Sequence, residues 1–408
     1  MFAYHFPPVA VSSGVQRTLS FSRNLPDLGW DASVVTVRPG AYERTHPGQL
    51  GDVHLSTHVI RTPALDAARH LTVFGRYPRV LATPDRWRSW LPFAVAAGVR
   101  EARRQRVDCI WSTFPIATAH LAALAVQRRT GLAWVADFRD SMSEQDYPTD
   151  PRLRRALRRI ESDVVARAAR CVFTAPGTLA MYARRYPEAR ARFSIIENGF
   201  DEDSFVQAGS GPDPEPTGGP LRLVHAGVLY PSERDPRAFF AALARLRDQG
   251  AIRADGVRVV LRASGHDARH RDAIAAAGVA DLVELAPPLP YVQALREMLH
   301  ADGLLLFQAS NCNHQIPAKL YEYLRAGKPV FALTDPTGDT AATLIRCGLG
   351  PIVPLHDEEA IVRELPAFID GVRAGTIHGA SADTTAQHTR QARSVQLAAL
   401  LDEVIISS

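Results

Sequence analysis

The sequence predicts an α/β protein with two Rossmann-like units and a final helical segment. Its 408 residues are too many for one ordinary hydrophobic core. Short apolar runs alternate with helical patterns in both halves, as in doubly wound parallel sheets. The stretch AGSGPDPEPTGGP lacks apolar periodicity and indicates a linker between the halves. We therefore expect a first domain over 1–207, a linker over 208–220, a second domain over 221–384 and a last helix over 385–408.

The composition is that of a globular protein, with 46% hydrophobic and 22% charged residues and a net charge of +4. The four cysteines have neither disulfide nor metal-ligand spacing, which fits a reducing compartment. We find no apolar run long enough to span a membrane and no signal-peptide pattern. These features predict a cytoplasmic protein.

The first half begins with an apolar strand over 1–6 and a loop that ends at Gly14. A helix over 15–28, a strand over 33–37, a strand over 108–112 and a helix over 117–129 follow. The first loop contains too little glycine for a dinucleotide-binding fingerprint, which argues against a Rossmann dehydrogenase. The strand over 133–136 ends in Asp137, Arg139 and Asp140, where parallel sheets bind ligands, although a local ion-pair network is the alternative. His120 is a weaker catalytic candidate, because a lone histidine on a helix is more often packed in the core.

In the second half we expect strands over 221–226, 257–263 and 304–307, a helix over 236–248, and a proline-rich loop over 285–291. The most informative stretch is QIPAKLYEYLRAGKPVFAL at 315–333. It predicts a loop, a helix that ends at Gly327, and a buried strand over 330–333.

Lys319 and Glu322 lie within that helix. The chain contains only two lysines, Lys319 and Lys328, against 45 arginines, so a compact point charge is indicated here. An amine at a helix amino terminus binds anions, and a glutamate accepts hydrogen bonds from paired hydroxyls. The pair suits a nucleoside diphosphate and its ribose. A solvated helix with an incidental ion pair is the alternative interpretation.

The segment IPAKLYEYLRAGKPV resembles the donor-binding motif of family 4 glycosyltransferases of the GT-B fold. Glu322 matches the second glutamate of that motif, which holds the ribose, whereas the first glutamate falls on His314. The segment GLAWVADFRDSM resembles a subgroup with a DFRDPW-like signature. HFPPVAVSSGVQR, IIENGFD and AGVLYPSERDP resemble further segments of the family. In the last of these, Arg234 takes the place of a phosphate-binding lysine, whereas Val228 and Thr113 occupy positions that usually hold arginine and histidine.

The resemblance implies a GT-B fold, in which two Rossmann-like domains face each other and the C-terminal helix crosses back to the N-terminal domain. It implies a metal-independent enzyme that needs no cofactor and uses a nucleotide sugar as the donor. Catalytic candidates are Arg234, Lys319, Asp137 and His120. The acceptor-side candidates are Asp137, Arg139 and Asp140. The donor-site candidates are Gly14, Gly227, Arg234, His314, Ile316, Lys319, Leu320 and Glu322.

Arginines are mixed with Phe74, Tyr77, Trp87, Trp90 and Phe93 over residues 69–106. Such a surface suits an anionic membrane, although solvated arginine-rich helices are an equal alternative. We find no nucleic-acid-binding motif and therefore expect no nucleic-acid partner.

The function that we predict is a retaining hexosyl transfer from a nucleotide-diphosphate sugar to a cytosol-facing acceptor. That acceptor would be a saccharide or a lipid-linked saccharide in surface polysaccharide or glycoconjugate synthesis, with the enzyme peripheral on the inner membrane face. The alternatives are a nucleotide-sugar epimerase of the same fold and a non-catalytic descendant that binds sugar or lipid. The sugar, nucleobase, acceptor, linkage and oligomeric state stay open.

Overall fold

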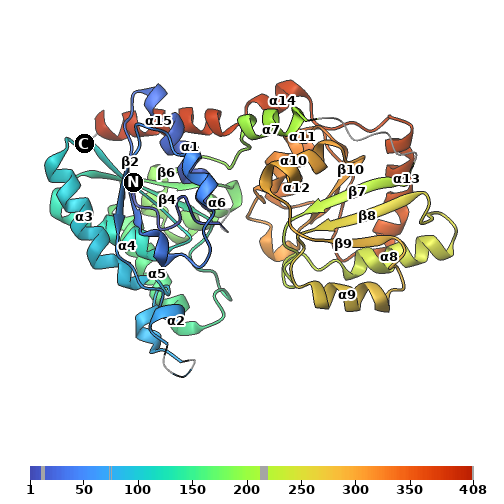
Figure 1. The fold of residues 1–408 in the computed structure, drawn as a ribbon, viewed down its shortest axis with the longest axis horizontal. Coiled ribbons are helices and arrows are strands. Elements are labelled where there is room, and N and C mark those ends of the chain that lie inside the picture. The colour runs from blue at the N-terminus through green and yellow to red at the C-terminus, as the bar shows by residue number, and fades with distance from the viewer. Residues whose placement is uncertain (11–13, 73, 75, 212–218, 407–408) are drawn as a thin grey trace. The chain divides into compact units, whose positions relative to one another are not determined.

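The computed structural model describes residues 1–408 except 11–13, 73, 75, 212–218 and 407–408. The chain forms two compact units, each built around a parallel sheet (Figure 1). The first unit contains Met1–Asn198 and Arg390–Ser408. The second unit contains Gly199–Thr389.

The sheet of the first unit has β2 and β1 on one side and β3, β4, β5 and β6 on the other. Phe2 joins the two parts through parallel bridges to Val35 and Ser112. The predicted strand over 1–6 is therefore reduced to a single bridging residue, which still holds the central place in the sheet. The strands are β1 (Ser33–Val37), β2 (His58–Thr62), β3 (Cys109–Thr113), β4 (Ala133–Arg139), β5 (Arg170–Phe173) and β6 (Phe193–Ile195).

The final helix, α15 (Arg390–Ile406), belongs to the first unit and covers part of its sheet. Leu397, Leu401 and Val404 pack with Trp111 and Val135 in one buried cluster. The segment predicted as one helix over 385–408 is thus divided between α14 (Ala382–Ala386) in the second unit and α15 in the first. The other helices of the first unit are α1 (Gly14–Asn24), α2 (Ala67–His70), α3 (Leu91–Arg104), α4 (Ala117–Thr130), α5 (Pro151–Arg167) and α6 (Pro176–Arg185).

The sheet of the second unit has the order β12-β11-β10-β7-β8-β9, and all of its strands are parallel. The chain leaves β7 in one direction through β8 and β9, and it leaves β10 in the other direction through β11 and β12. β7 and β10 therefore flank the topological switch point, where open α/β sheets bind ligands. The strands are β7 (Leu221–Ala226), β8 (Val257–Arg262), β9 (Val283–Ala286), β10 (Gly303–Phe307), β11 (Val330–Leu333) and β12 (Ile352–Val353).

Helices cover both faces of this second sheet (Figure 1). The apolar sides of α8 and α13 share one buried cluster with the strands. The proline-rich loop predicted over 285–291 is shorter than expected, because Leu285 and Ala286 belong to β9 and Tyr291 begins α10. The helices are α7 (Glu202–Gly209), α8 (Arg237–Asp248), α9 (Asp267–Ala276), α10 (Tyr291–Leu299), α11 (Lys319–Ala326), α12 (Asp339–Arg346), α13 (Glu358–Arg373) and α14 (Ala382–Ala386).

The change from the first to the second unit lies between Asn198 and Gly199, before the predicted linker. The reason is that α7 is held within the second unit. Arg325 of α11 makes two hydrogen bonds of 2.6 Å to the carboxylate of Glu202, and Arg296 of α10 donates to the carbonyl oxygen of Ala208 at 2.9 Å. Most of the predicted linker, residues 212–218, lies outside the described residues.

Candidate functional site

The candidate site lies in the second unit, where β7 and β10 end and α11 begins. Gln308 follows β10 directly, and its side-chain amide donates to the carbonyl oxygens of Cys312 at 2.9 Å and Gln315 at 3.0 Å. Thr340 of α12 donates to the same Gln315 oxygen at 3.1 Å. These bonds fix the loop that leads into α11, so that Lys319 is the first residue of the helix.

Lys319 reaches across to the end of β7. Its Nζ lies 3.0 Å from Nε2 of His225, a fully buried residue. A Cβ atom at Gly227 would lie 3.1 Å from the same Nζ, so the backbone of Gly227 passes directly beside the amine. Gly227 also has a φ of +107°, which other residues rarely adopt. The fold therefore places Lys319 beside Gly227, another donor-site candidate, and it adds His225, which the sequence did not indicate.

Arg234 supplies a second positive charge. Its guanidinium donates to the carbonyl oxygen of Val228 at 3.0 Å and lies over the ring of Tyr230, with Cζ 5.4 Å from the ring centroid. Burial and the charge of Arg234 hold the pKa of Lys319 well below its usual value, while Glu322 opposes the shift. A buried amine that lies beside a second cation is an electrostatic setting in which an anion binds favourably.

Glu322 lies one turn into α11. The phenol of Tyr291, at the start of α10, donates to Oε1 of Glu322 at 2.8 Å. This bond orients the carboxylate and leaves acceptor capacity on it for further donors, such as a pair of hydroxyls. Tyr291 was predicted only as the end of the proline-rich loop, and its contact with Glu322 was not foreseen.

The remaining donor-site candidates have less direct positions. Ile316 and Leu320 are buried and support the loop and the helix. His314 is half-buried in the loop before α11, with its Nε2 3.5 Å from the amide nitrogen of Gln315. Gly14 is the first residue of α1 in the first unit. The roles predicted for these four residues stay predictions.

In the first unit, Asp137 is fully buried near the end of β4 and is already bound by protein groups. Nε and Nη2 of Arg17 donate to its two carboxylate oxygens, each at 2.9 Å, and Thr113 donates at 3.0 Å. Arg17 also donates to the carbonyl oxygens of Ile196 at 2.9 Å and Glu197 at 3.0 Å. Asp137 therefore anchors α1 to the sheet, and its predicted catalytic and acceptor-side roles stay predictions.

Arg139 and Asp140 follow at the end of β4. Arg139 has a φ of +60°, and the register between β4 and β5 is irregular at this point. Its guanidinium is mostly buried and donates to the carbonyl oxygen of Phe114 at 3.3 Å. Burial lowers the pKa of Arg139, and the charges of Asp140 and Asp137 oppose that change. Such backbone strain is typical of functional loops, and the acceptor-side role of both residues stays a prediction.

His120 is a core residue and cannot contact a substrate. It is fully buried on α4, its Nδ1 lies 2.7 Å from Oγ of Ser112, and its ring packs against Phe114, Trp134 and Phe138. Burial lowers its pKa to about 4, so the ring is neutral at physiological pH. The weak catalytic candidacy of His120 is therefore wrong, because the position is occupied by packing.

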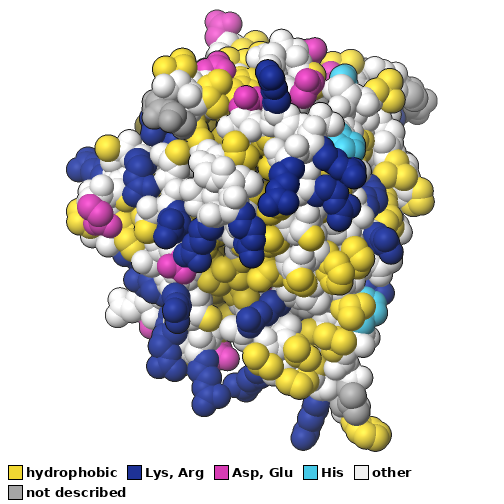
Figure 2. All heavy atoms as spheres, turned by 90° about the vertical axis from the view of Figure 1, so that its left-hand side faces the viewer, with side chains coloured by type: hydrophobic (Ala, Val, Ile, Leu, Met, Phe, Trp, Pro, Cys, Tyr) yellow, Lys and Arg dark blue, Asp and Glu magenta, His cyan; other side chains and the backbone are white. Residues whose placement is uncertain are grey.

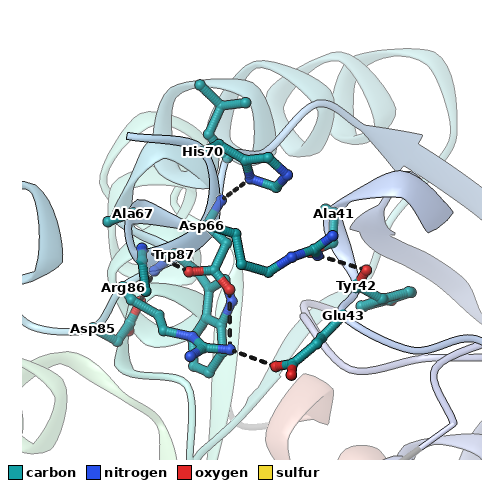
Figure 3. Close-up of polar contacts among 12 residues, drawn as sticks. Ala41, Tyr42, Glu43, Asp66, Ala67, His70, Asp85, Arg86 and Trp87 are labelled. Carbon is teal, nitrogen blue, oxygen red and sulfur yellow. Dashed lines mark hydrogen bonds and ion pairs between the residues drawn. The ribbon is translucent and has the colours of Figure 1, made fainter. Parts of the chain in front are cut away.

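The described residues of the segment 65–90, which exclude 73 and 75, are called the arm here, and charged groups fix its base (Figure 3). Asp66 caps α2 through the backbone amide of Ala68 at 3.0 Å and pairs with Arg86 at 3.0 Å, and Arg86 also reaches Glu43 at 3.4 Å. Arg69 donates to the carbonyl oxygen of Tyr42 at 2.7 Å.

Two of the aromatic residues predicted for a membrane surface are buried or partly buried. Trp90 is fully buried, and Trp87 is half-buried against Tyr4 and His5. Phe74, Tyr77 and Phe93 are exposed, as predicted.

A cavity of about 730 Å³ lies elsewhere in the first unit. It is lined by residues such as Ser33 and Cys109, which begin β1 and β3, so it lies at the amino-terminal end of the strands and not beside the candidate residues. Within the described part of the chain, no helix has the length and apolar character to cross a bilayer.

Residues 13–199 match the family model described as a glycosyl transferase 4-like domain. This match lies almost entirely in the first unit and covers less than half of the chain. A search of curated protein sequences finds no match to the chain. The subgroup with the DFRDPW-like signature is not resolved by this match.

Solved structures with the same fold cover essentially the whole chain. A glycosyltransferase from Rickettsia africae has a TM-score of 0.68 at 12% identity and covers 100% of this chain and 99% of its own. Sucrose-phosphate synthase from Thermosynechococcus elongatus has a TM-score of 0.66 at 14% identity, with coverages of 100% and 98%. Anabaena HepE in complex with UDP has a TM-score of 0.62 at 14% identity, with coverages of 98% and 99%.

These likenesses confirm the predicted GT-B fold. The match over residues 13–199 supports the prediction that the chain is a glycosyltransferase, and the solved structures show the fold alone.

We predict that Asp137→Asn destabilises the first unit by about 3 to 5 kcal/mol, because it leaves Arg17 buried without its counter-charge. The five tryptophans all lie in the first unit, so tryptophan fluorescence during urea unfolding measures the change. The control is Glu403→Gln, which breaks the more exposed ion pair with Arg170. It should lower the free energy of unfolding by no more than about 1 kcal/mol. Equal effects of the two substitutions would contradict the buried-pair interpretation.

We also predict that the first unit loses stability as the pH falls from about 6.5, the ordinary histidine pKa, toward 4. Over this range the unfolded chain binds a proton at His120, whereas the folded unit, whose His120 pKa is about 4, does not. The difference between the two pKa values corresponds to a loss of about 3 kcal/mol in the free energy of unfolding. His120→Asn should make the profile measured by tryptophan fluorescence shallower without removing its slope, because burial lowers the pKa of His5 in the same unit to about 4 as well. A profile as steep as that of the wild type in this variant would show that other groups cause the loss.

Proposed function

We propose that the protein transfers a hexosyl group from a nucleotide-diphosphate sugar to a cytosol-facing acceptor, with retention of the anomeric configuration. The observation that carries the proposal is the cluster at the switch point of the second sheet. Lys319, Arg234 and the amino-terminal end of α11 provide positive charge beside the Gly227 backbone, and Glu322 lies one turn further along the same helix. The cluster has the charge and hydrogen-bonding groups that a diphosphate and a ribose need.

In this proposal the second unit also promotes the reaction. Transfer of the sugar leaves negative charge on the nucleoside diphosphate. Fixed cations close to that charge stabilise the transition state more than the ground state, which is the usual source of electrostatic catalysis. Lys319 and Arg234 would carry this role, and Glu322, oriented by Tyr291, would hold the ribose.

The first unit is the proposed acceptor side. Arg139 and Asp140 lie at the carboxyl end of β4, in the region that matches the glycosyl transferase 4-like domain. The epimerase and the non-catalytic binding protein are the alternatives that share this fold. An epimerase would interconvert nucleotide sugars without an acceptor, whereas a binding protein would neither interconvert nor transfer them.

The donor proposal predicts that one class among UDP-, GDP-, TDP- and ADP-sugars raises the melting temperature. A ligand at one hundred times its Kd stabilises the folded protein by about 2.7 kcal/mol, and Lys319→Ala and Glu322→Ala should weaken binding and so reduce the shift at the same ligand concentration. Lys328→Ala is the matched control, because Lys328 is the other lysine of the chain and lies beyond the end of α11. No shift with any nucleotide sugar, or an equal shift in all variants, would overturn the donor assignment.

We further propose that the first unit contacts an anionic membrane surface, where a lipid-linked acceptor would be found. On the face shown in Figure 2, Lys and Arg side chains are much more abundant than Asp and Glu side chains and lie among hydrophobic ones. Phe74, Tyr77, Val80 and Leu81 are exposed on the arm, and its base is held by the ion pairs around Asp66. Apolar side chains that enter the interface beside arginines that pair with phosphate are typical of peripheral attachment.

The membrane proposal predicts sedimentation with phosphatidylcholine–phosphatidylglycerol vesicles but not with phosphatidylcholine vesicles alone. The double substitution Phe74→Ser and Leu81→Ser should reduce the bound fraction, and added salt should reduce it further because salt screens the arginine charges. Leu55→Ser is the control, since Leu55 is an exposed apolar residue outside the arm. Equal binding to both kinds of vesicle, or equal loss in the control, would contradict the proposal.

A further inference from the structure

His225 is a buried polar residue that the proposed reaction does not yet use. It lies near the carboxyl end of β7, two residues before Gly227, and it is fully buried. Its Nδ1 lies 2.8 Å from the carbonyl oxygen of Leu305 on the neighbouring strand β10. Its Nε2 lies 3.0 Å from Nζ of Lys319. The imidazole therefore connects the centre of the sheet to the first residue of α11.

The Leu305 contact decides which ring nitrogen carries the proton. A carbonyl oxygen can only accept a hydrogen bond, so Nδ1 must donate, and the neutral ring then has its lone pair on Nε2. Burial, followed by the charges of Lys319 and Arg234, holds the pKa of His225 well below its usual value, so the ring stays neutral. Nε2 is consequently an acceptor that faces the Lys319 amine.

The imidazole is also held in its orientation by its neighbours. The phenol of Tyr323 donates to the same Leu305 oxygen at 3.2 Å and accepts from the amide of Ala226 at 3.1 Å. The ring of Phe307 meets the His225 ring edge-on, with centroids 5.1 Å apart. A lysine has a flexible stem and a strongly hydrated head, so a fixed acceptor is an effective way to hold its amine in one place.

We propose that His225 is a positioning residue, which holds the Lys319 amine beside the Gly227 backbone for the diphosphate of the donor. The identity of the ligand in this inference rests on the proposed function. The link between His225 and Lys319 rests on the geometry alone. A merely structural histidine would support the core whether or not Lys319 is present. A positioning histidine affects donor binding only through Lys319.

Two substitutions at His225 test the hydrogen-bonding roles of Nδ1 and Nε2 separately. His225→Asn can keep a donor toward Leu305 and removes the acceptor toward Lys319. His225→Gln places an amide oxygen near the position of Nε2 and so can keep that acceptor. The two variants are matched in polarity, and their melting temperatures show whether each one folds.

The link can be tested without any ligand, because the chain contains only two lysines. In protein with ¹³C at the lysine ε carbons, NMR gives one resonance for Lys319 and one for Lys328, and Lys319→Arg assigns them. We expect His225→Asn to move the Lys319 resonance and to leave that of Lys328 in place, whereas His225→Gln should leave both close to the wild type. A Lys319 resonance that is unchanged in a folded His225→Asn variant would overturn the proposal.

The role in donor binding is tested by calorimetric titration with UDP-, GDP-, TDP- and ADP-sugars. We expect His225→Asn to weaken binding of the active nucleotide sugar about tenfold, or about 1.4 kcal/mol, and His225→Gln to weaken it less. In a Lys319→Ala background, His225→Asn should cause no further loss. An equal loss in both backgrounds would show that His225 acts through packing, which overturns the proposal. If no nucleotide binds the wild type while the NMR link is present, the proposed function fails and the positioning of Lys319 stands.

Discussion

Polar groups buried at the carboxyl ends of parallel strands must be paired inside the protein, and much of this structure depends on how that requirement is met. An unpaired charge in such a place costs several kcal/mol, whereas a paired one can be retained. In the first unit, Asp137 is satisfied by Arg17 and Thr113. In the second unit, His225 is satisfied by Leu305 on one side and Lys319 on the other.

The two solutions have opposite consequences for function. The Arg17–Asp137 pair uses both carboxylate oxygens and two backbone carbonyls, so its hydrogen bonds are made within the protein and stabilise the unit. The Lys319 amine is fixed by one neutral acceptor and lies beside a glycine backbone and a second cation. The first arrangement is complete in itself, whereas the second leaves positive charge that an anion can neutralise.

Sequence patterns predicted what depends on residues close together in the chain. The helix α11, its stop at Gly327 and the positions of Lys319 and Glu322 follow from apolar spacing and helix-ending signals within one short stretch. The two parallel sheets follow from alternating strand and helix patterns. The burial of His120 in an aromatic cluster also agrees with a local rule, because a lone histidine on a helix is more often packed in the core than catalytic.

What the sequence did not reveal depends on pairs far apart in the chain. His225 and Lys319 are separated by 94 positions, and Arg17 and Asp137 by 120, so nothing in the local pattern connects them. The domain boundary was misplaced for the same reason. The composition of the segment 208–220 indicates a linker, but the ion pair between Arg325 and Glu202 places α7 with the second unit.

The central claim is that the end of β7 and the start of α11 hold a nucleoside diphosphate. The most direct measurement is a crystal structure of the protein grown with the nucleoside diphosphate that stabilises it most. The account predicts phosphate oxygens within hydrogen-bond distance of Lys319 or Arg234 and the ribose hydroxyls on the carboxylate of Glu322. A nucleotide bound at another place, such as the cavity between the amino-terminal ends of β1 and β3, with these three side chains unoccupied, would contradict it.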